Sequence, residues 1–349
     1  MDDEPELRTR DWLPRTAALV LGTLALASAF IAAYVGALHK PDPKDVPVAV
    51  VTTDRQAQAV MSAVRARTDT IKPVGYDSQE RAVDGLNDRS VYAVLHSDPG
   101  GGLTLATASA GAPAATELVT DVFTEAARQA DVPLQVTDEV PVSDGDPRGL
   151  VPFYLAVGVV LGGYLASTAL GISLGTSPRD LRRAGLRIAT LAVHSILLGF
   201  VGAVLVGPVL DVFPHKVGTI AVIGALAAFA AGMVAAAVQA WLGLLGTGIV
   251  ILLLVVLGNP GSGGIYAPEF LPPFLRGMHR WNVPGLATDL VKSAIYFDWR
   301  GGGWALTGLL VWVVTGLVGL LTATMFRARR RAARTAPGRH AAGARNAEG

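Results

Sequence analysis

Six long apolar runs dominate the sequence, and they restrict the chain to folds that keep about 20 residues at a time out of water. The first run is Thr16–Leu38, and the others cover residues 150–171, 186–206, 217–238, 242–258 and 304–326. A helix of roughly 20 apolar residues crosses the hydrocarbon core of a bilayer. The sequence therefore predicts an α-helical polytopic membrane protein with about six transmembrane helices.

Two boundaries in this pattern leave an alternative open. No loop separates the fourth run from the fifth near residues 239–243, so one very long buried helix would also fit. The first run could be a signal peptide cleaved near Val35, Gly36 and Ala37. It is, however, longer than the roughly 7–15 apolar residues of such peptides. We expect two separate helices at residues 239–243 and a first helix, residues 16–38, that stays attached.

Basic residues are unevenly distributed along the chain. About half of the 29 lysines and arginines lie in residues 1–15, around residues 177–187 and in residues 327–349. Segments rich in lysine and arginine are retained on the cytoplasmic side of a membrane. We therefore expect a cytoplasmic N-terminal segment 1–15 and a cytoplasmic basic tail 327–349, so both termini are cytoplasmic. The abundance of Ala, Gly, Val and Arg is typical of a bacterium, which places this multi-pass protein in a bacterial plasma (inner) membrane.

Residues 39–148 have a different character, because they are rich in charge and contain no long apolar run. Turn-forming residues open and close the segment, with prolines at 41 and 43 and the sequence Ser-Asp-Gly-Asp-Pro at 143–147. Short apolar runs predict buried strands at residues 48–51, 91–95 and 103–106.

Helix signals alternate with these predicted strands. Thr53 with Gln56, and Asp77 with Glu80, have the spacing of a capping box. Pro113 begins a third helix with one apolar side, made by Leu118, Val119, Val122 and Phe123. The segment is therefore predicted to be a small extracytoplasmic α/β domain inserted between helices 1 and 2. A five-helix transmembrane domain, residues 149–326, follows it.

Several kinds of chemistry are disfavoured by the residues present. The chain has no cysteine, which removes disulfides, thiol nucleophiles and thiolate metal sites. It contains no P-loop sequence, and the glycine-rich stretch 258–264 lacks the lysine that a phosphate-binding loop needs. His39 and His96 have no carboxylate at a catalytic spacing, and basic residues do not alternate with aromatic ones as in a nucleic-acid surface. We expect a protein that is not an enzyme, holds no cofactor or metal and binds no nucleic acid.

Two features inside the apolar runs are candidates for a role, but each has a simpler explanation. His194 is the ionisable residue that stands out within a predicted helix, where a hydrogen bond to a neighbouring helix explains it as well as proton transfer does. The G-x-x-x-G patterns at 158–162 and 171–175 allow close helix contact, within one subunit or at a dimer interface.

The predicted outer loop, residues 259–303, is the most informative segment. Its first part predicts a tight turn at the outer interface, formed by Asn259, Pro260, Ser262, Gly263 and Gly264. Residues 287–297 predict a short helix, so that the loop is re-entrant or carries a surface helix. In that arrangement, apolar side chains rest on the membrane while Asp289 and Lys292 face water; the apolar set is Leu286, Leu290, Ile295 and Phe297.

The layout and several short motifs resemble the type-2 ABC exporter permease superfamily, in its phage infection protein (Pip)/YhgE-like branch. The matching stretches are Pro-Val-Ala-Val-Val at 47–51, Val-Tyr-Ala-Val-Leu at 91–95 and above all 258–264, with Leu-Pro-Pro-Phe at 271–274, Pro-Gly at 284–285 and Tyr-Phe-Asp at 296–298. The outer domain is much shorter than in larger members and has no coiled coil.

The resemblance implies the membrane (permease) subunit of an exporter, acting as a homodimer or heterodimer in the lipid bilayer with a separate ATPase subunit. The inner loop would contact that ATPase through Arg179, Asp180, Arg182 and Arg183. The same arginines are also explained as an orientation signal. The alternative function is a non-transporting membrane receptor or scaffold, whose outer domain binds a phage, a cell-wall polymer or a secretion component.

Overall fold

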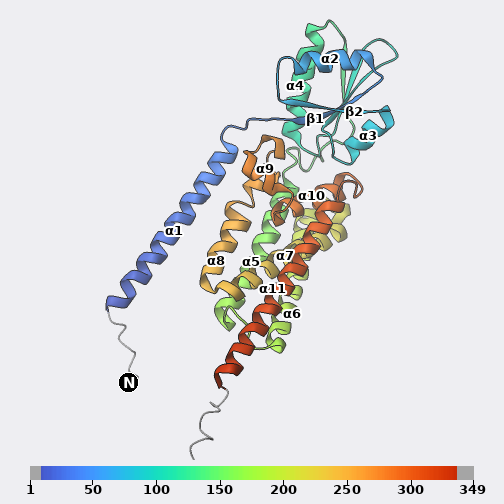
Figure 1. Cartoon of the computed structure of the whole chain (residues 1–349). Coiled ribbons are helices and arrows are strands. Elements are labelled where there is room, and N and C mark those ends of the chain that lie inside the picture. The colour runs from blue at the N-terminus through green and yellow to red at the C-terminus, as the bar shows by residue number, and fades with distance from the viewer. Residues whose placement is uncertain (1–8, 336–349) are drawn as a thin grey trace, which may run out of the picture.

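The computed structural model of the chain describes residues 9–335. It is mostly helical and has two parts, a small α/β unit and a bundle of long helices that extends away from it (Figure 1). The structure thus agrees with a helical membrane protein that carries a small α/β domain. Both described ends of the chain lie at the end of the helices that is remote from the α/β unit (Figure 1).

The α/β unit is a five-stranded sheet in the order β2-β1-β3-β4-β5. The strands are β1 (Val46–Val51), β2 (Ile71–Tyr76), β3 (Ala93–Ser97), β4 (Leu103–Thr107) and β5 (Leu134–Asp138). Only the β3–β4 pair is antiparallel. The three strands predicted from the sequence are present as β1, β3 and β4, while β2 and β5 are additional.

Helices cover both faces of this sheet. Val48 and Val50 of β1 pack with α2 (Arg55–Arg65) and α4 (Pro113–Gln129), whereas Ala49 packs on the opposite face with α3 (Gln79–Asn87). Successive side chains of β1 thus point to opposite faces of the sheet and are buried on both, as expected of a strand covered by helices on each side. Val119 and Phe123 of α4 are fully buried, as the apolar side of that predicted helix requires.

The caps of α2 and α3 lie one residue later than predicted. Asp54, not Thr53, caps α2, because its carboxylate accepts hydrogen bonds from the amides of Ala57 (3.0 Å) and of Ser97 on β3 (2.6 Å). Ser78 caps α3, while the carboxylate of Asp77 pairs with Arg81 at 2.9 Å. In the first case a contact to a neighbouring strand decides the cap, which local spacing does not reveal.

Five helices of the described chain are long and apolar enough to cross a membrane. They are α1 (Thr9–Leu38), α5 (Val151–Leu174), α6 (Leu181–Val204), α7 (Val217–Leu242) and α11 (Gly303–Thr335). A π-helical turn η1 (Leu205–Val209) and a 3₁₀ turn η2 (Pro214–Lys216) connect α6 to α7.

Helix α7 is the centre of the bundle, and small residues let its neighbours approach it. A side chain at Gly163 of α5 would come within 2.1 Å of the Ala228 carbonyl oxygen, and one at Gly199 of α6 within 2.4 Å of that of Ala221. Close backbone approach of this kind is how helices associate in membranes. Of the predicted G-x-x-x-G residues, Gly162 packs against Leu198, while Gly158 has no atom near its missing side chain.

The run at 242–258 is shorter than a membrane-spanning helix. Helix α7 ends at Gly243, whose φ of +62° suits glycine, and α8 (Leu244–Ile251) and the π-helical turn η3 (Leu252–Val256) follow. A long helix through residues 239–243 is therefore excluded. At 1.5 Å per residue the α8–η3 segment reaches about 20 Å, less than the roughly 30 Å of a hydrocarbon core.

Helix α1 stands apart from the other helices along most of its length (Figure 1). None of its membrane-length window is buried, and only its last turn enters a cluster, in which Ala37 packs with Leu271 and Leu275. Its exposed apolar side chains, such as Leu21 and Ile31, suit contact with lipid.

The segment 259–303, named the outer segment after its predicted location, lies between the bundle and the α/β unit (Figure 1). It contains the 3₁₀ turns η4 (Pro260–Ser262) and η5 (Pro268–Phe270), then α9 (Pro273–His279) and α10 (Val283–Tyr296). The expected surface helix is not found, because Leu286 and Leu290 of α10 are buried in the core of the bundle. Phe297 does not lie on a membrane surface either, since it enters the core beneath α3.

The outer segment also completes the hydrophobic core on the opposite face of the sheet, which α2 and α4 cover. Ala267 and Phe270 belong to the cluster that α2 and α4 form on the sheet. The α/β unit is therefore packed on the outer segment through both of its faces.

Candidate functional site

A cavity of about 450 Å³ opens where the α/β unit meets the outer segment. Its walls come from the end of α3 and the loop to β3, from η5, α9 and α10, and from the first turn of α11. Charged side chains line much of it, and the basic ones outnumber the acidic ones: Arg89, Arg276, Arg280 and Lys292 against Asp88, Glu269 and Asp289.

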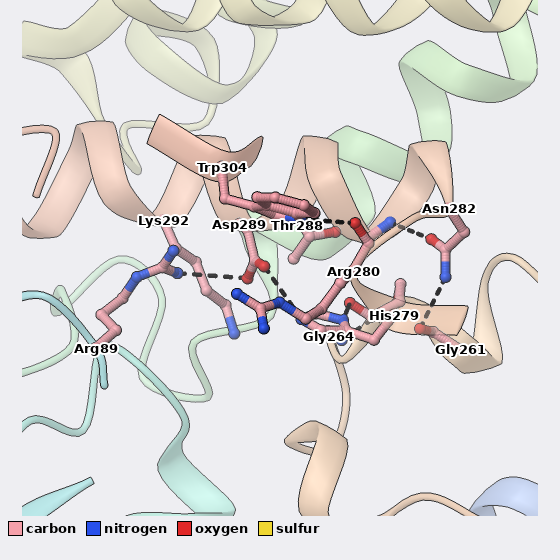
Figure 2. Close-up of polar contacts among 12 residues, drawn as sticks. Arg89, Gly261, Gly264, His279, Arg280, Asn282, Thr288, Asp289, Lys292 and Trp304 are labelled. Carbon is pink, nitrogen blue, oxygen red and sulfur yellow. Dashed lines mark hydrogen bonds and ion pairs between the residues drawn. The ribbon is translucent and has the colours of Figure 1, made fainter. Parts of the chain in front are cut away.

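Asp289 of α10 lies at the centre of the polar cluster (Figure 2). One of its carboxylate oxygens is 3.4 Å from Nη1 of Arg89, and the other is 3.1 Å from Nε2 of His279. Arg89 belongs to the α/β unit and His279 ends α9, so Asp289 joins three separate elements. All three side chains are at least two-thirds buried, which strengthens the attraction between their charges.

The pKa values of this cluster are shifted in opposite directions. Burial would raise the pKa of the Asp289 carboxyl, but the charges of His279 and Arg89 outweigh it and hold that pKa well below its usual value. Burial would likewise lower the pKa of His279, but the Asp289 charge overrides it and raises that pKa. The cluster therefore favours an ionised pair.

Lys292 lies one turn further along α10 and is 3% exposed. Its Nζ donates a hydrogen bond to the Gly111 carbonyl oxygen of the α/β unit at 3.0 Å. Burial lowers the pKa of Lys292 to about 8, with the Asp289 charge acting in the opposite direction. In the described residues no carboxylate lies within ion-pair distance of its ammonium group.

Two further arginines at the cavity are paired with groups other than carboxylates. Arg276 donates to the carbonyl oxygens of Pro268 and Glu269. The guanidinium of Arg280 lies 5.2 Å from the centre of the Trp304 ring, whose indole N–H donates to the Arg280 carbonyl oxygen (Figure 2). These guanidinium groups carry further N–H donors, from which an anionic group in the cavity can accept hydrogen bonds.

A tight turn at residues 259–264 positions His279. Asn259, Pro260 and Ser262 are buried, and the Ser262 hydroxyl links the Asn259 carbonyl oxygen to the Gly264 amide. The carbonyl oxygen of Ser262 lies 2.9 Å from Nδ1 of His279.

Both glycines of the turn sit where a side chain does not fit. Gly263 has a φ of +71°, and a Cβ there would lie 2.7 Å from the His279 ring. A Cβ at Gly264 would lie 2.3 Å from the Phe153 ring of α5. Asn282 secures the next element, because its amide donates to the Gly261 carbonyl oxygen and its side-chain oxygen caps α10 at Gly285 (Figure 2).

The predicted inner-loop residues lie at the opposite end of the bundle. Asp180 caps α6 by accepting from the Arg183 amide at 2.8 Å. Arg179, Arg182 and Arg183 are exposed. They form no part of the outer cavity.

The sequence did not identify the members of the outer cluster as a site. Asp289 and Lys292 were predicted to face water, and Arg89 and Glu269 were not singled out. Arg89 and Asp289 are 200 positions apart, so no local spacing connects them. His194, the ionisable residue singled out in an apolar run, has a buried Nε2 without a hydrogen-bond partner in the described chain and lies on α6, away from this cavity.

Comparison of the chain with models of protein families, with curated proteins and with solved structures finds no match.

Proposed function

We propose that the chain is the membrane (permease) subunit of an ABC-type exporter that works with a separate ATPase subunit. The observation that carries the proposal is the cationic cavity shared by the α/β unit and the outer segment, directly above the helical bundle. An exporter needs an outer site that a substrate occupies briefly on leaving the membrane region. The excess of arginine and lysine suits a substrate that carries an anionic group.

Helix α10 gives the bundle a means of acting on this cavity. Its apolar side belongs to the bundle core, while Asp289 and Lys292 line the cavity. A shift of α5 or α11 would therefore move Asp289 relative to Arg89, which belongs to the α/β unit. An occupant of the cavity that binds one arrangement better would, in turn, favour that arrangement of the helices.

The proposed topology has six crossings, of which the fifth is the α8–η3 segment, although at about 20 Å it is shorter than the hydrocarbon core that a full-length helix spans. An even number of crossings agrees with both described chain ends lying on the side remote from the α/β unit. The arginines at both ends favour a cytoplasmic location for that side, in a bacterial plasma membrane. The exposed inner loop, with Arg182, then faces the ATPase, and the permease acts as a homodimer or heterodimer.

Site-directed cross-linking tests the proposal, because the chain has no native cysteine. A cysteine that replaces Arg182 carries a photoreactive group in the native membrane. The expected product contains a protein with a P-loop sequence, and the purified pair hydrolyses ATP. A cysteine at Gly100, exposed on the α/β unit, is the matched control and should not give this product. A P-loop protein captured at neither position, or equally at both, contradicts the proposal.

The receptor or scaffold alternative is favoured by one observation. Strand β5 is an edge strand of the sheet, and Val136 on it is 42% exposed. Open edges of this kind accept an added strand from a partner. If this function is correct, Val136→Lys abolishes capture of an outer partner by the full chain, and no ATPase is found at Arg182.

A further inference from the structure

A second cavity, of about 260 Å³, lies at the end of the bundle remote from the α/β unit. The end of α5, the loop after it and the first three turns of α6 form its walls. Three arginines line it, namely Arg179, Arg183 and Arg187. The apolar part of the wall includes three leucines, Leu170, Leu174 and Leu186.

Arg187 is the unusual member of this group, because it is 4% exposed. Its Nη1 donates to the Thr176 carbonyl oxygen at 2.9 Å, but its buried Nε and Nη2 have no hydrogen-bond partner within the described residues. No carboxylate in residues 9–335 lies within ion-pair distance of it. Unsatisfied donors on a buried cation are costly, so these two groups favour an anion that accepts hydrogen bonds from them.

The other two arginines increase the positive charge at the mouth of the cavity. Arg179 and Arg183 are exposed, and the nearest carboxylate, Asp180, is 3.8 Å from Arg183 and is used to cap α6. A phosphate group has the charge and the oxygens to accept from several guanidinium groups at once.

The apolar wall indicates where such a phosphate comes from. Leu174 and Leu186 are 70% and 66% exposed, and they border the outward-facing apolar surface of α5 and α6. The cavity thus lies where charged loop residues give way to apolar helices, which is the level of lipid headgroups.

We propose that this cavity binds the phosphate of an anionic phospholipid, with the acyl chains along Leu174 and Leu186. Arg187 contacts the phosphate from inside, and Arg179 and Arg183 contact it from the mouth. The volume suits a headgroup, not a whole lipid. This site is independent of the exporter proposal, because it makes no use of the outer cavity or of an ATPase.

The test compares the full chain in nanodiscs of phosphatidylcholine alone with nanodiscs that contain phosphatidylglycerol. We expect the anionic lipid to raise the Tm of the wild-type chain and to remain bound in native mass spectrometry. Arg187→Gln should weaken this binding about tenfold, the scale of one lost charge-assisted hydrogen bond. Arg182→Gln, next to Arg183 in the first turn of α6 but outside the cavity, should leave it unchanged.

Arg183→Gln gives an independent readout, because the side chain is exposed and its removal spares the fold. It should also weaken lipid binding, by a smaller factor than Arg187→Gln. Equal binding by the Arg183→Gln and Arg182→Gln chains overturns the proposal, even if Arg187→Gln does not fold. Inorganic phosphate that raises the Tm as much as the lipid overturns the lipid assignment in favour of a soluble anion. Arg187-dependent binding of a purified ATPase without any lipid effect assigns the cavity to a protein interface instead.

Discussion

Asp289→Asn is the most informative substitution in the outer cluster. It keeps the shape of the side chain but removes the negative charge that Arg89 and His279 share. Loss of one partner of a buried ion pair costs about 3–5 kcal/mol. Because the Asp289 side chain is 29% exposed, water screens part of the effect, and we expect a loss of about 2–3 kcal/mol near neutral pH.

The pH dependence distinguishes this electrostatic loss from a packing defect. The raised pKa of His279 contributes stability that is complete below its unfolded value of about 6.5 and is lost as the pH rises through its folded value. Without Asp289, two of the causes that raise the pKa of His279 are lost, while burial, the largest single cause, still acts to lower it. The fall in stability between about pH 5.5 and 7.5 should therefore be smaller in the variant than in the wild type, or be replaced by a rise.

Lys292 adds a second change of stability with pH, in a higher pH range. Its folded pKa of about 8 lies below its unfolded value, so the cost of burying its charge is complete below about pH 8. Stability is regained between about pH 8 and 10.5 as the unfolded chain comes to hold more protons than the folded one. This rise should be present in both chains, and in Asp289→Asn it should begin at a lower pH, because the Asp289 charge that raises the pKa of Lys292 is gone.

Thermal unfolding of the detergent-solubilised full chain, followed across this pH range, measures these effects. The loss should appear as a fall in Tm of about 5 °C near pH 7. Asp144→Asn is the matched control, because Asp144 is exposed and has no ion pair in the described chain. Parallel pH profiles for wild type and Asp289→Asn, or an equal loss in Asp144→Asn, would refute the reasoning.

Two further predictions concern the segment around the cavity. Gly263→Val should lower the free energy of unfolding by about 2–4 kcal/mol, because it adds a clash with His279 to an unfavourable φ. The control Gly277→Val, whose added side chain meets no atom within 4 Å, should cost little. Equal losses of the two variants in denaturant unfolding would contradict this prediction. Phe270→Ala should lower the free energy of unfolding by about 3–5 kcal/mol, because it opens a void beneath the sheet. The control Phe274→Ala, at a residue that is 66% exposed, should be nearly neutral in the same assay. Similar losses of the two variants would show that the sheet does not depend on the outer segment.

The order of elements could be predicted from the sequence because each depends on a local pattern. Long apolar runs predicted the helices α1, α5, α6, α7 and α11, and short apolar runs predicted the strands β1, β3 and β4. Strand β5 was missed because its residues are largely exposed and carry no apolar run.

The site could be predicted only in part. A tight turn at Gly263 could be predicted, since its glycines mark a conformation that other residues resist. The orientation of α10 was wrong, because an apolar helix face fits a protein core as well as a membrane surface, and composition does not distinguish them. Gly301 shows the same limit: no local pattern distinguishes it from an ordinary loop glycine, yet a Cβ there would lie 2.4 Å from the Asp88 carbonyl oxygen.

The docking of Phe270 and Phe297 into the sheet has a consequence for the order of events during synthesis. The last strand, β5, ends at Asp138, so the ribosome adds about 130 further residues before it reaches Phe270. At synthesis rates of roughly 5–20 residues per second this takes about 7–26 s. During that interval part of the core of the α/β unit is uncovered. We expect the unit to become resistant to protease only after the segment around Phe297 has been made, so this region matures late, although its strands are made early.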